Sequence, residues 1–128
     1  MRHGDSVAKI AVVDDDEAVR QAISSLLQSA GYQCKVYASA ELFIGVCAWQ
    51  QANCAIVDFR LPGLNGLELQ RMLNEKRHSV PIIMVSAYDD RVRAEALEQG
   101  AVAVLGKPFD GEALLAAVRS ALGPWGRE

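Results

Sequence analysis

Acidic side chains follow two apolar stretches of the chain directly, in a pattern that suits metal or phosphate chemistry. The stretch IAVVDDD runs four apolar residues into Asp14, Asp15 and Asp16, and the stretch CAIV ends at Asp58. Carboxylates that lie close together repel one another and raise one another's pKa values. A hard divalent cation relieves this repulsion, and two or three carboxylates suit Mg²⁺, which keeps several of its waters. If Asp14, Asp15 and Asp58 meet in the folded chain, they predict a Mg²⁺ site.

Two further apolar stretches end at side chains that could act on a phosphate group. PIIMV is followed by the hydroxyl of Ser86, and AVAVLG is followed by the ammonium of Lys107. If these stretches are parallel strands of one sheet, their carboxyl ends lie at one edge, where such sheets bind their ligands. Three carboxylates, a hydroxyl and an ammonium would then share one pocket, and Lys107 would offset part of the negative charge.

Each of these residues also has a purely structural interpretation. Aspartate favours the N-cap and the first turn of a helix, and we assign Asp16 and Glu17 to that role. Taken alone, the DDD run favours capping, Lys107 a solvated surface charge and Ser86 a helix cap. Complementary chemistry at four of the five expected strand ends outweighs these separate interpretations.

Alternating strand and helix patterns position these residues. Short apolar or β-branched runs predict strands at 9–13, 33–37, 54–57, 81–85 and 101–105. Helical spacing predicts five helices. The first runs from Asp16 to a stop at Gly31, and the second is capped by Ser39 and carries the apolar stripe Leu42, Phe43, Val46 and Trp49. The third is capped by Asn65, the fourth is capped by Asp89 or Asp90 and closed by Gly100, and the fifth covers 110–122. Five strand–helix units predict an α/β fold, a doubly wound parallel sheet with right-handed crossovers and helices on both faces.

Length and composition indicate one globular domain. Of the 128 residues, 51% are hydrophobic and 23% are charged, as is ordinary for a folded domain. We assign 1–8 to an N-terminal extension, 9–122 to the domain and 123–128 to a C-terminal tail. The net charge of −3 gives no electrostatic attraction to nucleic acid or anionic lipid. Three cysteines without metal-binding spacing, and no apolar run of membrane-spanning length, predict free thiols in a cytoplasmic domain that binds neither nucleic acid nor membrane.

Four stretches resemble the receiver domain of bacterial two-component response regulators: VVDDDEAVR, IVDFRLPGLNG, PIIMVSA and GAVAVLGKPF. The similarity extends from about Lys9 to Leu122 in the order and spacing of that family, and DFRLPGLNG resembles the nitrogen-fixation and nitrate-response transcriptional type. The resemblance implies a (βα)5 flavodoxin-like sheet of strand order 2-1-3-4-5. It also implies a signalling switch that receives a phosphoryl group from a sensor histidine kinase. Such a domain is not a metabolic enzyme, because it assists only its own phosphorylation and dephosphorylation.

Carried over residue by residue, the resemblance makes Asp58 the phosphoacceptor. Asp14 and Asp15 would hold Mg²⁺ together with Asp58 and the backbone carbonyl of Arg60. A carboxylate can be the nucleophile of phosphoryl transfer, and the protein's task is then mainly positioning and charge neutralisation.

The other matched positions would contact the phosphoryl group or shape its surroundings. Ser86 matches the switch hydroxyl of the family, and Lys107 matches the lysine that pairs with the phosphoryl group. Pro108 is expected to follow a cis peptide bond. The backbone N–H of Ala87 could donate to a phosphoryl oxygen.

Two variable positions beside the site could set the lifetime of the phosphorylated state. Arg60 lies two residues after Asp58, and Tyr88 lies two residues after Ser86. Both side chains are bulky and can hydrogen-bond phosphoryl oxygens or each other, and neither is a base that could activate water at neutral pH. We expect them to shield the phosphoryl group from water and to slow its loss; the structural alternative is that both side chains point to solvent.

The expected fifth strand departs from the family pattern. Val104 stands three residues before Lys107, where the family usually has Tyr or Phe, and Val102 and Ala103 replace paired acidic residues of receivers with winged-helix outputs. We therefore do not expect aromatic–hydroxyl coupling in its usual form, although Ser86 could still move its loop, and we do not expect a charge-laced symmetric dimer. The face formed by the fourth helix, fifth strand and fifth helix should be apolar through Val102 and Val104, unless helix residues cover Val104. That face is the expected surface for an output domain, an effector protein or a phosphorylation-dependent dimer.

Two other classes of protein share part of this pattern. A haloacid-dehalogenase-like phosphatase would use Asp14 as its nucleophile, with Ser86 and Lys107 in its later motifs. Asp14, Asp15 and Asp16 satisfy the DxD pattern of that class after a strand. Against this alternative, no threonine follows the pattern, no hydrophobic strand with an acidic pair follows Lys107, and no cap domain is expected. A flavodoxin-type cofactor binder is rejected, because three aspartates would repel the phosphate from its first loop. The position of the phosphorylated aspartate, Asp58 or Asp14, separates the receiver from the phosphatase.

Overall fold

The computed structural model describes residues 7–46, 48–76, 80–87 and 90–123. These residues form five parallel strands: β1 Lys9–Val13, β2 Gln33–Tyr37, β3 Cys54–Asp58, β4 Ile82–Ser86 and β5 Ala103–Gly106. Their order in the sheet is β2-β1-β3-β4-β5, which confirms the order implied by the resemblance. The strand order reverses between β1 and β3, so the carboxyl ends of these two strands flank the switch point at which such sheets bind ligands.

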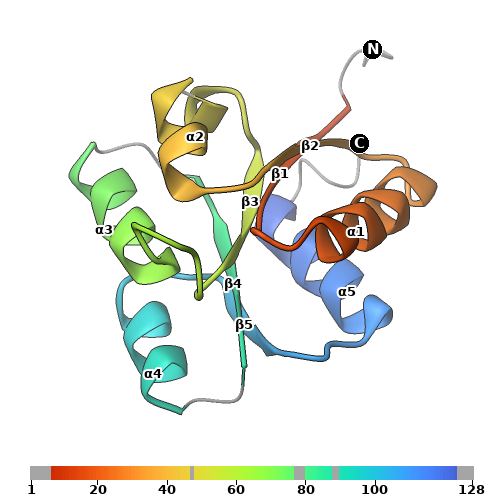
Figure 1. Cartoon of the computed structure of the whole chain (residues 1–128). Helices are drawn as coiled ribbons and strands as arrows, with labels where there is room; N and C mark the ends of the chain where they lie inside the picture. The colour runs from red at the N-terminus through yellow and green to blue at the C-terminus, as the bar shows by residue number, and fades with distance from the viewer. Residues whose placement is uncertain (1–6, 47, 77–79, 88–89, 124–128) are drawn as a thin grey trace.

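Helices cover both faces of this sheet (Figure 1). The helices α2 Ala40–Gly45, α3 Gly66–Glu75 and α4 Asp90–Glu98 lie on one face, and α1 Glu17–Ser29 and α5 Gly111–Leu122 lie on the other. A short 3₁₀ helix, Ala48–Gln50, follows α2. Within the described ranges, no helix combines the length and the apolar composition needed to cross a bilayer. The layers confirm the predicted doubly wound α/β fold.

The alternation of side chains along each strand divides the core into two layers. Val13 and Val57 belong to the layer under α2, α3 and α4, whereas Val12 and Ile56 belong to the layer under α1 and α5. Successive side chains of a strand point to opposite faces. A strand that is covered on both faces therefore needs an unbroken apolar sequence. This requirement explains the apolar runs that lead into the aspartates.

Polar side chains fix where the helices begin. Asp16, Ser39, Asn65 and Asp110 cap α1, α2, α3 and α5, each by accepting a backbone hydrogen bond from the first turn. The cap of α3 is reciprocal, because Asn65 Oδ1 accepts from the N–H of Glu68 at 2.9 Å and Glu68 Oε1 accepts from the N–H of Asn65 at 2.8 Å. For α4, Asp90 is the first helical residue, and Asp89 lies outside the described residues.

The helix predicted after Ser39 is shorter than expected. It ends at Gly45, and Trp49 lies in the separate 3₁₀ helix instead of extending the apolar stripe. Leu42 and Val46 are 54% and 64% exposed, so Phe43 is the one fully buried member of the predicted stripe. Glycine is a poor helix former, and the apolar spacing of this segment continues past the residue at which the backbone leaves the helix.

The apolar face predicted around β5 is also smaller than expected. The strand begins at Ala103, two residues later than predicted. Val104 is 8% exposed and packs in the same core layer as Ala96 of α4, so it lies beneath that helix. Val102, which is 38% exposed, and Leu97 are the large apolar side chains that remain on the described part of this face.

Two of the cysteines can be placed. Cys34 is a half-buried free thiol, and Cys54 is a fully buried one, as predicted; Cys47 lies outside the described residues. Burial raises the pKa of Cys54 to about 12. Because the thiolate is the reactive form, Cys54 is inert in the folded protein.

Candidate functional site

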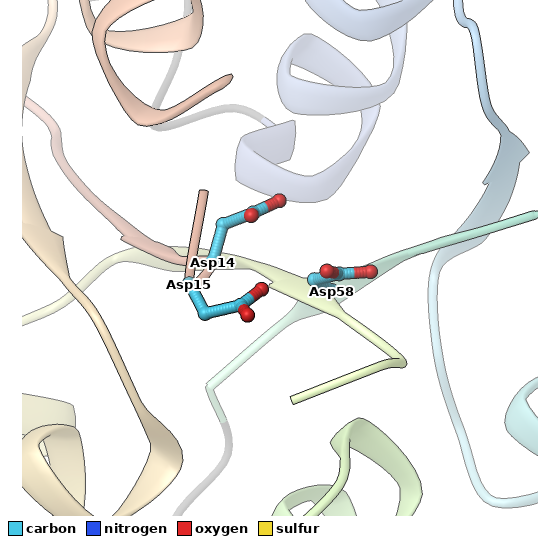
Figure 2. Close-up of side chains that lie close together, drawn as sticks. All are labelled: Asp14, Asp15 and Asp58. Atoms are coloured by element: carbon cyan, nitrogen blue, oxygen red, sulfur yellow. The ribbon is translucent and has the colours of Figure 1, made fainter. Parts of the chain in front are cut away.

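The ends of β1 and β3 bring three carboxylates together. Asp14 and Asp15 follow β1, Asp58 is the last residue of β3, and one oxygen of each lies within 4.8 Å of the others (Figure 2). Asp14 and Asp58 are buried, whereas Asp15 is exposed. The gathering of these three carboxylates is the arrangement that the sequence predicted.

Lys107 lies between two of these carboxylates. Its Nζ atom is 3.3 Å from Asp14 Oδ2 and 3.3 Å from Asp58 Oδ2. Burial raises the pKa of Asp58, and the charge of Asp14 raises it further, while Lys107 opposes both effects. Burial by itself would lower the pKa of Lys107, but the charges of Asp58 and Asp14 outweigh it and leave this pKa raised. Lys107 is therefore held as a cation against a cluster that has excess negative charge.

Asp14 is held at each of its polar atoms. Its N–H donates to the carbonyl of Tyr37 at 3.0 Å, and its Oδ1 accepts from the N–H of Asp16 at 2.9 Å. Its Oδ2 contacts Lys107, and its carbonyl oxygen accepts from Nη1 of Arg20 at 2.7 Å. Sequence reasoning did not identify Arg20, because a bond to a backbone carbonyl leaves no pattern of paired residue types.

Asp58 is positioned by its neighbours in the sheet and by a close backbone contact. The N–H of Phe59 donates to the carbonyl of Val85 at 2.8 Å, and the N–H of Arg60 donates to Asp58 Oδ1 at 3.3 Å. A Cβ atom at Gly66, the first residue of α3, would lie 2.8 Å from the carbonyl oxygen of Asp58. Only glycine lets the start of α3 approach the end of β3 this closely.

The loop between Asp58 and α3 is braced from α2. Glu41 Oε2 accepts a hydrogen bond from the N–H of Leu64 at 2.8 Å, and this bond lowers the pKa of Glu41. Gly63 in the same loop has a φ of 74°, a conformation that residues with a side chain rarely adopt. The sequence motifs do not predict this contact with Glu41.

Of the other predicted residues, Ser86, Ala87 and Arg60 follow or end strands at the same edge of the sheet. Ser86 ends β4, and its buried hydroxyl donates to the carbonyl of Ala87 at 2.7 Å, so it is directed at its own neighbour and not at the carboxylates. Arg60 is exposed, and the Lys107–Pro108 peptide bond is cis, as expected. Tyr88 lies outside the described residues.

This chain is similar to one family of domains, to several curated proteins and to several solved structures. The model of the response regulator receiver domain matches residues 10–119. The chain is 40% identical over 124 residues to the response regulator protein TodT of Pseudomonas putida. The matched stretch covers 95% of this chain and 55% of TodT. It is 39% identical over 115 residues to the transcriptional regulatory protein FixJ of Azorhizobium caulinodans, which covers 89% of this chain and 54% of FixJ. The crystal structure of FixJ-N matches with a TM-score of 0.83 at 29% identity, over 90% of this chain and 93% of that chain.

These similarities agree with the family that the sequence motifs indicated. The chain spans about half the length of the curated relatives it matches. The similarity to FixJ bears out the likeness to regulators of the transcriptional type, and nothing among the matches supports the phosphatase alternative. The strand order, the acidic cluster and the matched span lead to one conclusion: this chain belongs to the response regulator receiver domain family.

Proposed function

We propose that this receiver accepts a phosphoryl group on Asp58 in the presence of Mg²⁺ and thereby switches its partner-binding surface. The supporting observation is the position of the Asp58 carboxylate, which lies within 4.8 Å of oxygens of Asp14 and Asp15 and 3.3 Å from the ammonium of Lys107. This arrangement presents a nucleophilic oxygen beside groups that can neutralise a phosphoryl group.

The donor set fits Mg²⁺. The cluster of Asp14, Asp15 and Asp58 offers only carboxylate oxygens, and the backbone carbonyl of Arg60 is the proposed fourth protein ligand. Hard oxygen ligands in this number leave room for waters and for a phosphoryl oxygen, as Mg²⁺ requires. When bound, the ion would supply positive charge between the carboxylates and the equatorial phosphoryl oxygens.

The side chains of the site have separate tasks in the transfer. An oxygen of Asp58 attacks the phosphorus of the donor and forms an acyl phosphate, while the bond between phosphorus and the leaving group breaks. Lys107, already 3.3 Å from Asp58, would exchange part of its carboxylate contact for a phosphoryl oxygen. The hydroxyl of Ser86 would turn from the carbonyl of Ala87 toward the new phosphoryl group, and the N–H of Ala87 would donate to it.

The proposed partners follow from the family and from the described surface. A sensor histidine kinase is the proposed phosphodonor. An output domain or effector is proposed to contact the face of α4, β5 and α5, on which Leu97 and Val102 are exposed. A phosphorylation-dependent dimer would use the same face. The net charge of −3 supports a signalling role in which this region itself binds neither nucleic acid nor membrane.

Acetyl phosphate with Mg²⁺ tests the proposal directly. Intact mass should increase by one phosphoryl group in the parent protein, and the increase should be absent in Asp58→Asn and in the presence of EDTA. Reduction of the acyl phosphate with borohydride, followed by peptide mapping, identifies the modified residue. Modification at Asp14 would favour the phosphatase, and equal labelling of Asp58→Asn would refute the assignment.

A further inference from the structure

Arg20 contacts the acidic cluster through the backbone. It is the fourth residue of α1, and its Nη1 atom donates to the carbonyl oxygen of Asp14 at 2.7 Å. Long side chains on a helix lean toward its N-terminus, which brings the guanidinium of Arg20 back over the turn between β1 and α1. The short distance and the charged donor make this a strong hydrogen bond, and the half-buried position of Arg20 reduces competition from water.

The bond is aimed at the peptide that carries Asp15. The carbonyl of Asp14 and the N–H of Asp15 belong to one planar unit that also contains the Cα atom of Asp15. Fixing that carbonyl therefore fixes the point from which the Asp15 side chain starts. The other polar atoms of Asp14 are already held by Tyr37, Asp16 and Lys107.

The side chain of Asp15 is held less firmly than those of Asp14 and Asp58. Its side chain is exposed, and no described residue donates a hydrogen bond to its carboxylate or forms an ion pair with it. Asp14 and Asp58, in contrast, are both paired with Lys107. The direction in which the Asp15 side chain leaves the backbone is therefore set by the Asp14–Asp15 peptide, and Arg20 holds that peptide.

We infer that Arg20 is a positioning residue for the metal site, which orients Asp15 by holding the Asp14–Asp15 peptide. This inference rests on the proposed binding of Mg²⁺. The inference predicts the direction in which the affinity for Mg²⁺ changes when Arg20 is replaced. Removing a cation near a Mg²⁺ site would tighten Mg²⁺ binding by charge alone, whereas losing the orientation of a ligand weakens it. Weaker binding in a folded variant that lacks the charge is therefore the sign of lost positioning.

The test is a titration of the purified protein with MgCl₂, followed by amide chemical shifts in NMR spectra. Arg20→Met keeps most of the side-chain stem and removes both the charge and the donors. Its Kd for Mg²⁺ should rise about tenfold, the usual lower range for losing an outer support of a metal ligand. Arg20→Lys keeps the charge and one donor group, so its Kd should fall between those of Arg20→Met and the parent.

Gln21→Met is the matched control, because Gln21 is the next residue of α1 and its side chain, among the described residues, hydrogen-bonds only to Glu17, at 3.3 Å. Its Kd should equal that of the parent. Melting temperatures without metal should show that each variant is folded. If Arg20→Met does not fold, Arg20→Gln replaces it with the same expected direction.

The outcomes separate this inference from the proposed function. A parent protein that shows no saturable shift with MgCl₂ overturns the proposed metal site and this inference with it. A parent that binds Mg²⁺, together with a neutral Arg20 variant that binds as tightly or more tightly, overturns the role of Arg20 alone. A raised Kd in that variant, with partial recovery in Arg20→Lys, supports it.

Discussion

The ammonium of Lys107 lies 3.3 Å from Oδ2 of Asp58, and each of the two groups changes the proton affinity of the other. This ion pair joins the end of β3 to the residue that follows β5, across the strand β4. It is therefore both a part of the proposed phosphorylation site and a link between strands that are not hydrogen-bonded neighbours.

Replacing Lys107 with methionine should destabilise the metal-free protein. The buried carboxylates of Asp14 and Asp58 would lose their shared cation. Removing one partner of a fully buried pair costs about 3–5 kcal/mol, and the partial exposure of Lys107 reduces this to about 2 kcal/mol. Urea unfolding in EDTA measures the loss. Lys35→Met, at an exposed position of β2, should change the free energy of unfolding by less than about 0.5 kcal/mol. Equal effects of the two replacements would contradict the prediction.

Asp58→Asn should make the metal-free protein more stable at neutral pH. The pKa of Asp58 is raised in the folded state, first by burial and then by Asp14. The folded protein therefore binds a proton more readily than the unfolded chain, and ionised Asp58 costs stability above its raised pKa. The advantage of the asparagine variant should shrink as the pH falls through the raised pKa of folded Asp58 toward the ordinary pKa of the unfolded carboxyl group. Denaturant unfolding of both proteins across this pH range measures how the difference between their free energies of unfolding changes with pH. A difference in the free energy of unfolding that stays constant with pH would contradict the prediction.

Gly66→Ala should destabilise the protein and disturb Asp58. The added Cβ would lie 2.7 Å from Met84 Sδ, 2.8 Å from the carbonyl oxygen of Asp58 and 2.9 Å from the Cα of Phe59. Overpacking of this kind costs about 1–3 kcal/mol, and labelling by acetyl phosphate should slow as well.

Gly45 offers the matched control for this prediction. It is the last residue of α2, and a Cβ there would meet nothing within 4 Å. Gly45→Ala should stabilise the protein by up to about 1 kcal/mol, the difference in helix propensity. Similar melting temperatures for the two alanine variants would show that the approach of α3 to β3 is not tight.

Gln70→Met should leave stability unchanged or raise it by up to about 1 kcal/mol. Gln70 is 2% exposed between α3 and α4; its Nε2 donates to the carbonyl of Ala96, but its Oε1 accepts no hydrogen bond from any described residue. The carbonyl of Ala96 also accepts from the N–H of Ala101, so it keeps a partner in the variant. Gln70→Ala would leave a cavity and should cost about 2 kcal/mol or more. Thermal unfolding distinguishes the two, and a loss in Gln70→Met as large as that in Gln70→Ala would show that the amide itself stabilises the core.

Replacing Arg60 and Tyr88 together with alanine should shorten the life of the phosphorylated state. Arg60 is exposed beside Asp58, and we expect both side chains to obstruct the in-line approach of water. The loss of the phosphoryl group, followed by intact mass after the donor is removed, measures this rate. Decay no faster than that of the parent would refute the shielding role.

The sequence alone revealed the site more completely than the surroundings of the site. The strands that are buried on both faces must be apolar throughout, so IAVV and CAIV marked where Asp14 and Asp58 would lie. Two contacts of one kind were not predicted. Arg20 donates to the carbonyl of Asp14, and Glu41 accepts from the N–H of Leu64. Each bond joins a side chain to a backbone group, and every residue has such a group. The end of α2 also escaped, because apolar spacing continues through Val46 although the helix stops at Gly45.

The position of β1 and β3 at the centre of the sheet has a consequence for hydrogen exchange. Each of these strands pairs with a neighbour on both sides, whereas β2 and β5 pair on one side only. Amide protons of the central pair should therefore exchange only through global unfolding, while those of the edge strands and outer helices exchange through smaller openings. Asp14 and Asp58 are therefore attached to strands whose amide protons should be among the slowest to exchange, together with those of β4, which also pairs on both sides. An opening of an edge strand or an outer helix should therefore leave the separation of the two carboxylates unchanged.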